Sequence, residues 1–207
     1  MPQEIEAKYK VDSFARVRRR LREAGGVYLG TVLQTDLYHD TPGRRLLGSD
    51  CGVRIRRTRC LHRPPGGAGR RDTRALLTYK GPAQPDRRAK IRNEVQTRLD
   101  DAAAVSAVFE ALGLEPTLTL QKRRATWRLG RCLVELDELP VLGRFVEIES
   151  SGTEHIESAR GKLGLSETPP ITDHYVRMAM RACKRLGGGC RELTFSNCNA
   201  CGRNGSA

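Results

Sequence analysis

Charged side chains recur at every second position in seven short segments of the chain, and this spacing constrains the fold more than any other feature. Successive side chains of an extended strand point to opposite faces, so Glu4-Ile5-Glu6-Ala7-Lys8 predicts a strand with one charged and one apolar face. The apolar faces of the other segments carry residues such as Ile55, Leu77 and Val134. The charged faces comprise Glu4, Glu6 and Lys8; Arg54 and Arg56; Thr78 and Lys80; Arg92, Glu94 and Gln96; Lys122 and Arg124; Glu135 and Asp137; and Glu147 and Glu149.

The signs of these charges are sorted by segment. Acidic pairs lie at residues 4–6, 135–137 and 147–149, and basic pairs lie at 54–56 and 122–124. A solvated strand face is the ordinary interpretation of a single Glu-x-Glu, but solvated faces usually intersperse the two signs. If the charged faces instead point into a closed barrel, its interior becomes a water-filled tunnel with an acidic lobe and a basic lobe.

Hydrophobic periodicity and turn residues predict eight strands and four helices. Eight strands, several of them joined by short turns, would leave unprotected edges unless the sheet closed on itself. We therefore expect an α+β fold, an eight-stranded antiparallel closed β-barrel or tunnel with peripheral helices, and a long exposed hairpin loop at 62–74. The strands are expected at about 3–11, 27–39, 51–60, 75–80, 90–99, 118–129, 131–139 and 144–150, and the helices at about 13–24, 101–112, 154–163 and 173–186.

The chain is long enough for one domain with a tail. Residues 1–187 are expected to form the tunnel domain, and residues 188–207, which contain Gly and Cys, a disordered tail. Among the 207 residues, 37 Lys and Arg outnumber 24 Asp and Glu, a formal net charge of +13 that favours a polyanionic partner such as a phosphate compound. No run of about 18 apolar residues is present, and the charged N-terminus is unlike a signal peptide, so we expect no membrane association and a cytoplasmic location.

The seven Cys are then expected to be mostly free thiols. Four of them lie near the C-terminus at a spacing that matches no common zinc module, although the last two form a C-x-x-C: Cys183, Cys190, Cys198 and Cys201. The four His residues are not paired at metal-ligand spacing either. The sequence therefore assigns no zinc site.

A tunnel with an acidic and a basic lobe suits a triphosphate bound together with Mg²⁺ or Mn²⁺. Arg and Lys pair with phosphate oxygens, and carboxylates hold hard divalent cations. Such a site performs phosphoryl-group chemistry by positioning the substrate and neutralising its charge, with the metal ion activating the nucleophile.

Several motifs together resemble the CYTH superfamily, the triphosphate tunnel metalloenzymes. The resemblance covers about residues 3–185, and its motifs are specific jointly, not singly. They are the E-x-E-x-K start, Gln34-x-Asp36-x-Tyr38-x-Asp40-Thr41-Pro42, Arg54-Ile55-Arg56, Leu77-Thr78-Tyr79-Lys80-Gly81-Pro82, Lys122-x-Arg124, Leu136-Asp137 and Gly143-x-Phe145-Val146-Glu147-Ile148-Glu149.

The resemblance implies roles for particular residues. Tyr38 and Lys80 become candidates for nucleophile activation or proton transfer, although Tyr38 is equally well interpreted as a buried tyrosine bonded to a neighbouring strand. The implied metal ligands are Glu4, Glu6, Asp137, Glu147 and Glu149. The implied triphosphate-binding residues are Lys8, Arg54, Arg56, Lys80, Arg92, Lys122 and Arg124.

Some residues depart from the family pattern. Gln96 stands where the family often has a third acidic residue after Glu94, which weakens any metal role for that strand. Cys51-Gly52 replaces a bulkier pair before the R-x-R strand, and the tail beyond about residue 187 has no counterpart that we recognise.

Three functions are compatible with these residues. The closest resemblance is to class IV (CyaB-type) adenylate cyclases, which convert ATP to cyclic AMP and pyrophosphate. An alternative is an inorganic or organic (thiamine) triphosphatase that releases orthophosphate. The third is a polyphosphate- or RNA-binding module without catalysis, but carboxylates beside the phosphates would weaken pure polyanion binding. The expected partners are thus a nucleoside or other triphosphate and a second copy of the chain, with no specific nucleic acid.

Overall fold

The computed structural model describes residues 3–64, 75–84, 89–187 and 190–197. Within these residues the chain forms nine strands and five helices. The strands are β1 (Gln3–Val11), β2 (Val27–Asp40), β3 (Gly52–His62), β4 (Ala75–Gln84), β5 (Lys90–Leu99), β6 (Glu115–Leu129), β7 (Cys132–Leu139), β8 (Gly143–Ser150) and β9 (Glu192–Leu193). The helices are α1 (Ala15–Glu23), α2 (Arg45–Gly48), α3 (Ala102–Ala111), α4 (Thr153–Leu163) and α5 (Tyr175–Arg185).

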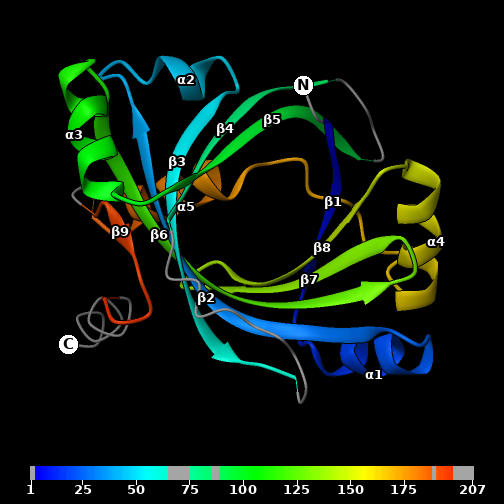
Figure 1. Ribbon diagram of the computed structural model, residues 1–207. Coiled ribbons are helices and arrows are strands. Elements are labelled where there is room, and N and C mark those ends of the chain that lie inside the picture. Colours follow the sequence, from blue (N-terminus) through cyan, green and yellow to red (C-terminus); the bar gives the residue numbers. More distant parts are fainter. Residues whose placement is uncertain (1–2, 65–74, 85–88, 188–189, 198–207) are drawn as a thin grey trace.

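Strands β1 to β8 close into a ring, which confirms the predicted fold class. Their order is β2-β3-β4-β5-β1-β8-β7-β6, and β6 pairs with β2 to complete the ring; every pairing in it is antiparallel. The ring encloses an interior, and the helices lie around its outside and at one end (Figure 1). Closure pairs strands that would otherwise be edges.

The alternation of side chains divides each strand between two environments. On β7, Val134 and Leu136 point outward into a core that α1 and α4 cover, and both are almost fully buried. A second core forms where α5 packs against Phe145 and Leu120, and α3 covers Ile55 in a third. The apolar residues therefore face the helices, and the charged faces of the strands point into the ring.

Element bounds differ from the sequence predictions mostly by a few residues. The short helix α2 and the short strand β9 were not predicted. β4 extends to Gln84 because pairing with β5 resumes after a register shift between Lys80 and Ala83. Residues 65–74 of the predicted hairpin loop lie outside the described residues.

Part of the segment that was expected to be a disordered tail has a defined place. Residues 190–197 are described, and β9 pairs in parallel with β6. Leu193 is fully buried in the core under α5. The remaining tail residues are outside the described part of the chain, and a domain boundary at residue 187 stays a prediction.

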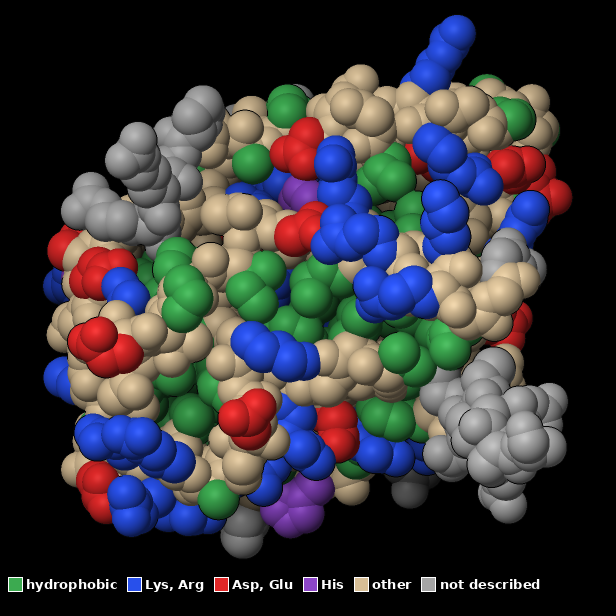
Figure 2. All heavy atoms as spheres, turned by 180° about the vertical axis from the view of Figure 1, so that it is seen from behind, with side chains coloured by type: hydrophobic (Ala, Val, Ile, Leu, Met, Phe, Trp, Pro, Cys, Tyr) green, Lys and Arg blue, Asp and Glu red, His purple; other side chains and the backbone are tan. Residues whose placement is uncertain are grey.

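The molecular surface carries the positive surplus of the composition. Seen from the side opposite to Figure 1, Lys and Arg side chains occupy many positions, with Asp and Glu side chains among them (Figure 2). In the described residues, no helix has both the length and the apolar character that crossing a membrane requires.

Candidate active site in the barrel interior

A cavity of about 450 Å³ occupies the interior of the ring. All eight strands of the ring contribute side chains to its lining, together with the loop before β3 and the start of α5. Most lining residues are charged or polar: Glu6, Lys8, Tyr38, Asp50, Arg54, Arg56, Thr78, Lys80, Lys90, Arg92, Glu94, Gln96, Lys122, Arg124, Glu135, Glu147, Glu149, His174 and Tyr175. The charged strand faces thus point inward, as a tunnel requires.

The cavity collects most of the residues that the sequence singled out. Every predicted triphosphate-binding residue lines it, as do Tyr38 and three of the predicted metal ligands, Glu6, Glu147 and Glu149. Asp137 lies behind the lining and is fully buried, so it reaches the cavity only through its neighbours. The side chain of Glu4 is outside the described part of the structure.

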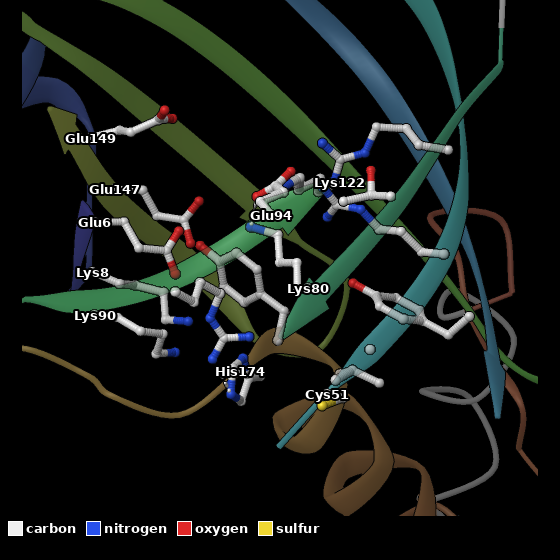
Figure 3. A pocket seen from close by; sticks show the side chains of 18 of the residues that line it. Glu6, Lys8, Cys51, Lys80, Lys90, Glu94, Lys122, Glu147, Glu149 and His174 are labelled. Atoms are coloured by element: carbon white, nitrogen blue, oxygen red, sulfur yellow. Dashed lines mark hydrogen bonds and ion pairs between the residues drawn. The ribbon is translucent and has the colours of Figure 1, made fainter. Parts of the chain in front are cut away.

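Acidic side chains gather on β1, β8 and β7. Glu6 of β1 lies directly opposite Glu149 of β8, and Glu147 of β8 lies directly opposite Glu135 of β7. Figure 3 shows Glu6, Glu147 and Glu149 on neighbouring strands at one side of the cavity. Like charges directly opposite one another in a sheet destabilise it, so this arrangement favours a cation between them.

We call the acidic side chains of β1, β7 and β8 the acidic wall. One guanidinium, that of Arg124, already pairs with part of it. Arg124 donates through Nε to Asp137 Oδ1 at 2.7 Å and through Nη2 to Asp137 Oδ2 and Glu147 Oε2, each at 2.5 Å. Its Nη1 forms an ion pair with Glu135. We call Arg124, Glu135, Asp137 and Glu147 the Arg124 cluster; all four side chains are largely removed from solvent.

The two cavity-lining carboxylates of this cluster differ in proton affinity. Burial raises the pKa of Glu147, but Arg124, Lys122 and Lys8 more than offset this effect and hold the pKa well below its usual range. Burial also raises the pKa of Glu135, and there Arg124 does not offset it fully, because Asp137 and Glu147 are close. At neutral pH Glu147 is therefore the more firmly ionised of the pair.

A second buried cluster joins β2 and β3 and has the opposite composition. Asp36 Oδ1 accepts from Arg56 Nε at 2.6 Å, Asp36 Oδ2 accepts from Arg56 Nη2 at 2.7 Å, and Arg54 Nη1 lies 3.5 Å from Asp36 Oδ2. Burial raises the pKa of Asp36, but Arg56 and Arg54 outweigh it and lower the pKa far below its usual range. We call these three residues the Asp36 cluster. Its bidentate pair fixes the plane of the Arg56 guanidinium beside the cavity.

Lys122 and Tyr38 lie among these charges. Burial and, next, Arg124 lower the pKa of Lys122 to about 8, although Asp137 opposes them. Burial, followed by Asp36, raises the pKa of Tyr38. Tyr38 therefore keeps its phenol proton at neutral pH, whereas Lys122 gives up its proton more readily than an exposed lysine.

The second predicted catalytic residue is tied to a carboxylate. Lys80 Nζ of β4 lies 2.8 Å from Glu94 Oε2 of β5, its direct cross-strand partner. Gln96, which replaces the acidic residue expected there, donates to the other oxygen of Glu94. Both side chains line the cavity, and the amide thus supports Glu94 without adding a charge.

A polar network closes one end of the cavity around Asp50. Asp50 adopts a left-handed backbone conformation with φ of 57°. Its carboxylate accepts from Ala83 N at 2.9 Å, pairs with His174 Nε2 at 2.8 Å and lies 3.3 Å from Arg92 Nη2. Arg177 of α5 also approaches it. The network ties the start of α5 to the loop before β3 and to β4.

Five residues of the site were given no role and lie on none of the charged strand faces that the sequence analysis named. Asp36 and Lys90 lie two positions from Tyr38 and Arg92, so the same alternation could have indicated them. Asp50, His174 and Tyr175 belong to a loop and a helix start, where no strand periodicity applies. Their inclusion in the lining depends on tertiary packing.

The donor set fits a hard divalent cation. Glu6, Glu135, Glu147 and Glu149 offer only carboxylate oxygens, which Mg²⁺ and Mn²⁺ prefer. Among the described residues no three His, Cys, Asp or Glu converge at coordination distance, and Arg124 pairs with one oxygen of Glu135 and one oxygen of Glu147. Glu6 and Glu149, which lie directly opposite one another on β1 and β8 and line the cavity, would supply the first ligands.

The cysteines form no comparable site. Cys183 and Cys190 bring their sulfur atoms to 3.4 Å, and the described cysteines are free thiols. Cys198 and Cys201 lie outside the described residues. Cys51 lines the cavity end near Asp50.

Comparisons with known proteins agree with the fold. A family model described as the CYTH domain matches residues 2–167. A protein of Methanocaldococcus jannaschii named as a candidate adenylate cyclase is 26% identical over 148 residues, 72% of this chain and 77% of that protein.

Solved structures share the architecture. The PH1819 protein of Pyrococcus horikoshii OT3 superposes with a TM-score of 0.71 and 25% identity, over 86% of this chain and 99% of that one. A Hippeastrum protein, described as a candidate adenylyl cyclase with a dominant triphosphatase activity, gives a TM-score of 0.62 at 18% identity, over 90% and 97% of the two chains. With a family model that spans most of its length, the chain belongs to the CYTH domain family.

Proposed function

We propose that the chain is a metal-dependent enzyme that acts on a triphosphate bound in the barrel, in the manner of a class IV adenylate cyclase. One observation carries the proposal: many carboxylates and many cationic side chains line the same cavity. Carboxylates without a metal ion would repel a polyphosphate, and cations alone would need no acidic wall. A triphosphate with Mg²⁺ or Mn²⁺ matches both parts.

The phosphate chain would lie against the basic side of the cavity. Arg54 and Arg56 present guanidiniums that Asp36 orients, and Arg92 and Lys122 add further positive charge. Lys80, which forms an ion pair with Glu94, could hold or transfer a proton. These groups neutralise the charge that develops on the departing phosphate.

Glu6, Glu147 and Glu149 would hold the metal ion, with Glu135 beside them. Asp137 would act on the metal ion only indirectly, because its oxygens already accept hydrogen bonds from Arg124 and Lys122. A bound Mg²⁺ or Mn²⁺ would supply Lewis-acid chemistry, which neutralises phosphate charge and favours ionisation of the attacking oxygen. Tyr38, protonated at neutral pH, can donate a hydrogen bond to the same region.

A triphosphatase is the second candidate. It is favoured by the nearly continuous charged lining, in which Leu47, Val176 and two tyrosines provide the main apolar surface for a purine ring. The Hippeastrum protein has this fold and a reported triphosphatase activity, which belongs to that protein. The two reactions use the same phosphate-binding groups and differ in whether a ribose hydroxyl or water attacks.

The test is a product analysis with three substrates. The protein is incubated with ATP, tripolyphosphate or thiamine triphosphate and with Mg²⁺ or Mn²⁺, and cyclic AMP, pyrophosphate and orthophosphate are resolved. Cyclic AMP as the main product from ATP supports the cyclase, and orthophosphate alone supports the triphosphatase. Absence of turnover together with tight metal-independent binding would refute both reactions and favour a binding module.

A matched pair of variants tests the metal role. Glu149→Gln keeps the shape of the side chain and removes one cavity charge, so metal-dependent product formation should fall roughly 10- to 100-fold. Glu138→Gln removes a carboxylate from the outer face of β7, where Glu138 pairs with Arg123 and Arg144, and should keep the wild-type rate. Equal rates for both variants would exclude Glu149 from the metal site.

A further inference from the structure

Tyr175, the first residue of α5, is a buried tyrosine that none of the motifs indicated. Its side chain is only 9% exposed, and it lines the cavity. Its phenol oxygen is buried and has no hydrogen-bond partner within the described part of the chain. A buried hydroxyl without a partner costs stability, so an unpartnered one at a binding cavity indicates a ligand atom.

The phenol stands among the groups that the proposed reaction uses. Burial raises the pKa of Tyr175 well above its usual value, and the nearby carboxylates of Glu147 and Asp137 raise it further. The phenol therefore keeps its proton at neutral pH and acts as a hydrogen-bond donor. A donor suits an anionic oxygen, whereas a protonated phenol is a poor ligand for a cation.

The ring of Tyr175 also contacts two of the predicted phosphate-binding lysines. Lys8 Nζ lies 4.1 Å and Lys122 Nζ 5.2 Å from the ring centroid, within the range of cation–π attraction. Phe145 meets the ring edge-on at a centroid distance of 5.2 Å, which limits its rotation. One aromatic ring thus positions two ammonium groups from β1 and β6.

The segment that carries Tyr175 is fixed to the barrel on both sides. Lys8 Nζ donates to the carbonyl oxygen of Asp173 at 2.6 Å, and Ile171 N donates to the carbonyl oxygen of Lys8 at 2.7 Å. His174, beside Tyr175, pairs with Asp50 at 2.8 Å. The phenol is therefore held in place before a ligand arrives, and little ordering is required on binding.

We propose that Tyr175 is a further substrate-binding residue, whose phenol O–H donates a hydrogen bond to a phosphate oxygen of the bound triphosphate while its ring positions Lys8 and Lys122. This role rests on the proposed function. It assigns to α5 a direct part in the site, in addition to closing one end of the barrel. The competing role is structural, in which the buried phenol and the ring only stabilise the packing of α5 against the barrel.

The test compares Tyr175→Phe with Tyr9→Phe. Tyr9 is a matched control because it is fully buried and its phenol oxygen also lacks a partner, but it lies in the core under α4, outside the cavity. Both variants lose one buried hydroxyl and keep the ring. Tripolyphosphate binding is measured by titration calorimetry both with Mg²⁺ and in EDTA without divalent metal, and thermal unfolding and ATP turnover are measured in parallel.

Tyr175→Phe should bind tripolyphosphate roughly tenfold more weakly, because a hydrogen bond to a charged acceptor is lost, without a lower unfolding midpoint. Tyr9→Phe should bind like the wild type. Tyr175→Leu, which also removes the ring, should weaken binding further than Tyr175→Phe. Affinity of Tyr175→Phe within twofold of the wild type, or a lower midpoint with unchanged affinity, would overturn the proposal.

The measurements separate this proposal from the reaction. Turnover by the wild type with unchanged binding by Tyr175→Phe overturns the role of Tyr175 alone. Weakened binding by Tyr175→Phe without turnover of any triphosphate by the wild type overturns the reaction alone. A wild type that binds no tripolyphosphate overturns the role of Tyr175 as well.

Discussion

The Asp36 cluster and the Arg124 cluster are built from the same residue types in opposite proportions. In the first, one carboxylate lies between two guanidiniums; in the second, one guanidinium lies among three carboxylates. Taken alone, the first keeps a positive surplus and the second a negative one. The difference teaches that ion pairs inside the barrel do not cancel its charge but divide it into two regions of opposite sign.

The two surpluses suggest a division of labour. The Asp36 cluster orients two guanidiniums and leaves positive charge for phosphate, whereas the Arg124 cluster leaves carboxylate charge for a cation. Lys122 lies between them, since it is 3.4 Å from Asp137 and also lowers the pKa of Asp36. Removing the central residue of each cluster should therefore have different consequences, which the following predictions state from the largest effect to the smallest.

Arg124→Met should have the largest effect on stability. Without the guanidinium, Glu135, Asp137 and Glu147 would share a buried site in which Lys122 and Lys8 are the nearest remaining cations, and a buried charge that loses its partner costs about 3–5 kcal/mol. Urea unfolding measures the loss. Mg²⁺ should restore part of the lost stability in this variant by replacing the missing cation.

Arg123→Met is the control for this change. Arg123 is the preceding residue of β6, is about half exposed at 49% and pairs with Glu138 on the outer face, so its removal should cost less than about 1 kcal/mol. Similar losses for the two variants would contradict the central position of Arg124 in the acidic wall.

Asp36→Asn should have a smaller effect. Asparagine keeps the shape and one acceptor for Arg56, and Arg54 can still reach the cavity, so we expect a loss of about 2–3 kcal/mol in the free energy of unfolding. Because no carboxylate then neutralises the charge of the two guanidiniums, tripolyphosphate should stabilise this variant more than it stabilises the wild type. Asp100→Asn, at an exposed residue, is the control and should change neither quantity. Equal stabilisation of Asp36→Asn and the wild type by tripolyphosphate would remove the Asp36 cluster from the phosphate site.

The sequence predicted the barrel because charged and apolar side chains alternate along each strand, and this alternation depends only on residues that are neighbours in the sequence. Which faces point inward followed from the sorting of charges, and the residues that line the cavity confirm it. The composition of each cluster could not be predicted, because it depends on register between strands. Arg124 was grouped with the basic lobe, yet pairing with β7 places it opposite Asp137, within the acidic wall.

Asp36 illustrates the same limit from the other side. It was part of a recognised motif but received no role, since an isolated acidic residue on a strand does not reveal its partner. The register of β2 against β3 sets Asp36 directly opposite Arg56 and so creates the bidentate pair. Tyr175 and His174 enter the cavity at the start of a helix, where only packing decides which residues face inward.

Replacement of His174 should have the smallest effect on stability among these predictions. This residue lies at the end of the cavity around Asp50. Burial and, next, Lys90 and Arg92 lower its pKa to about 4, although Asp50 opposes them. In the unfolded chain a histidine takes up its proton below about pH 6.5, whereas folded His174 stays neutral until about pH 4. The unfolded state then binds more protons in this window, so stability should fall as the pH decreases.

The prediction compares the wild type with His174→Gln, whose amide can still donate to Asp50. Between pH 7 and pH 5 the wild type should lose about 1–2 kcal/mol more than the variant in urea unfolding. At pH 7 to 8 the imidazole is neutral in both the folded and the unfolded state, so the stability difference between the two proteins should there be independent of pH. Since the lowered pKa arises from burial together with two nearby cations, a parallel pH dependence of wild type and variant would mean that burial and the charges of Lys90 and Arg92 do not keep His174 neutral at this end of the cavity.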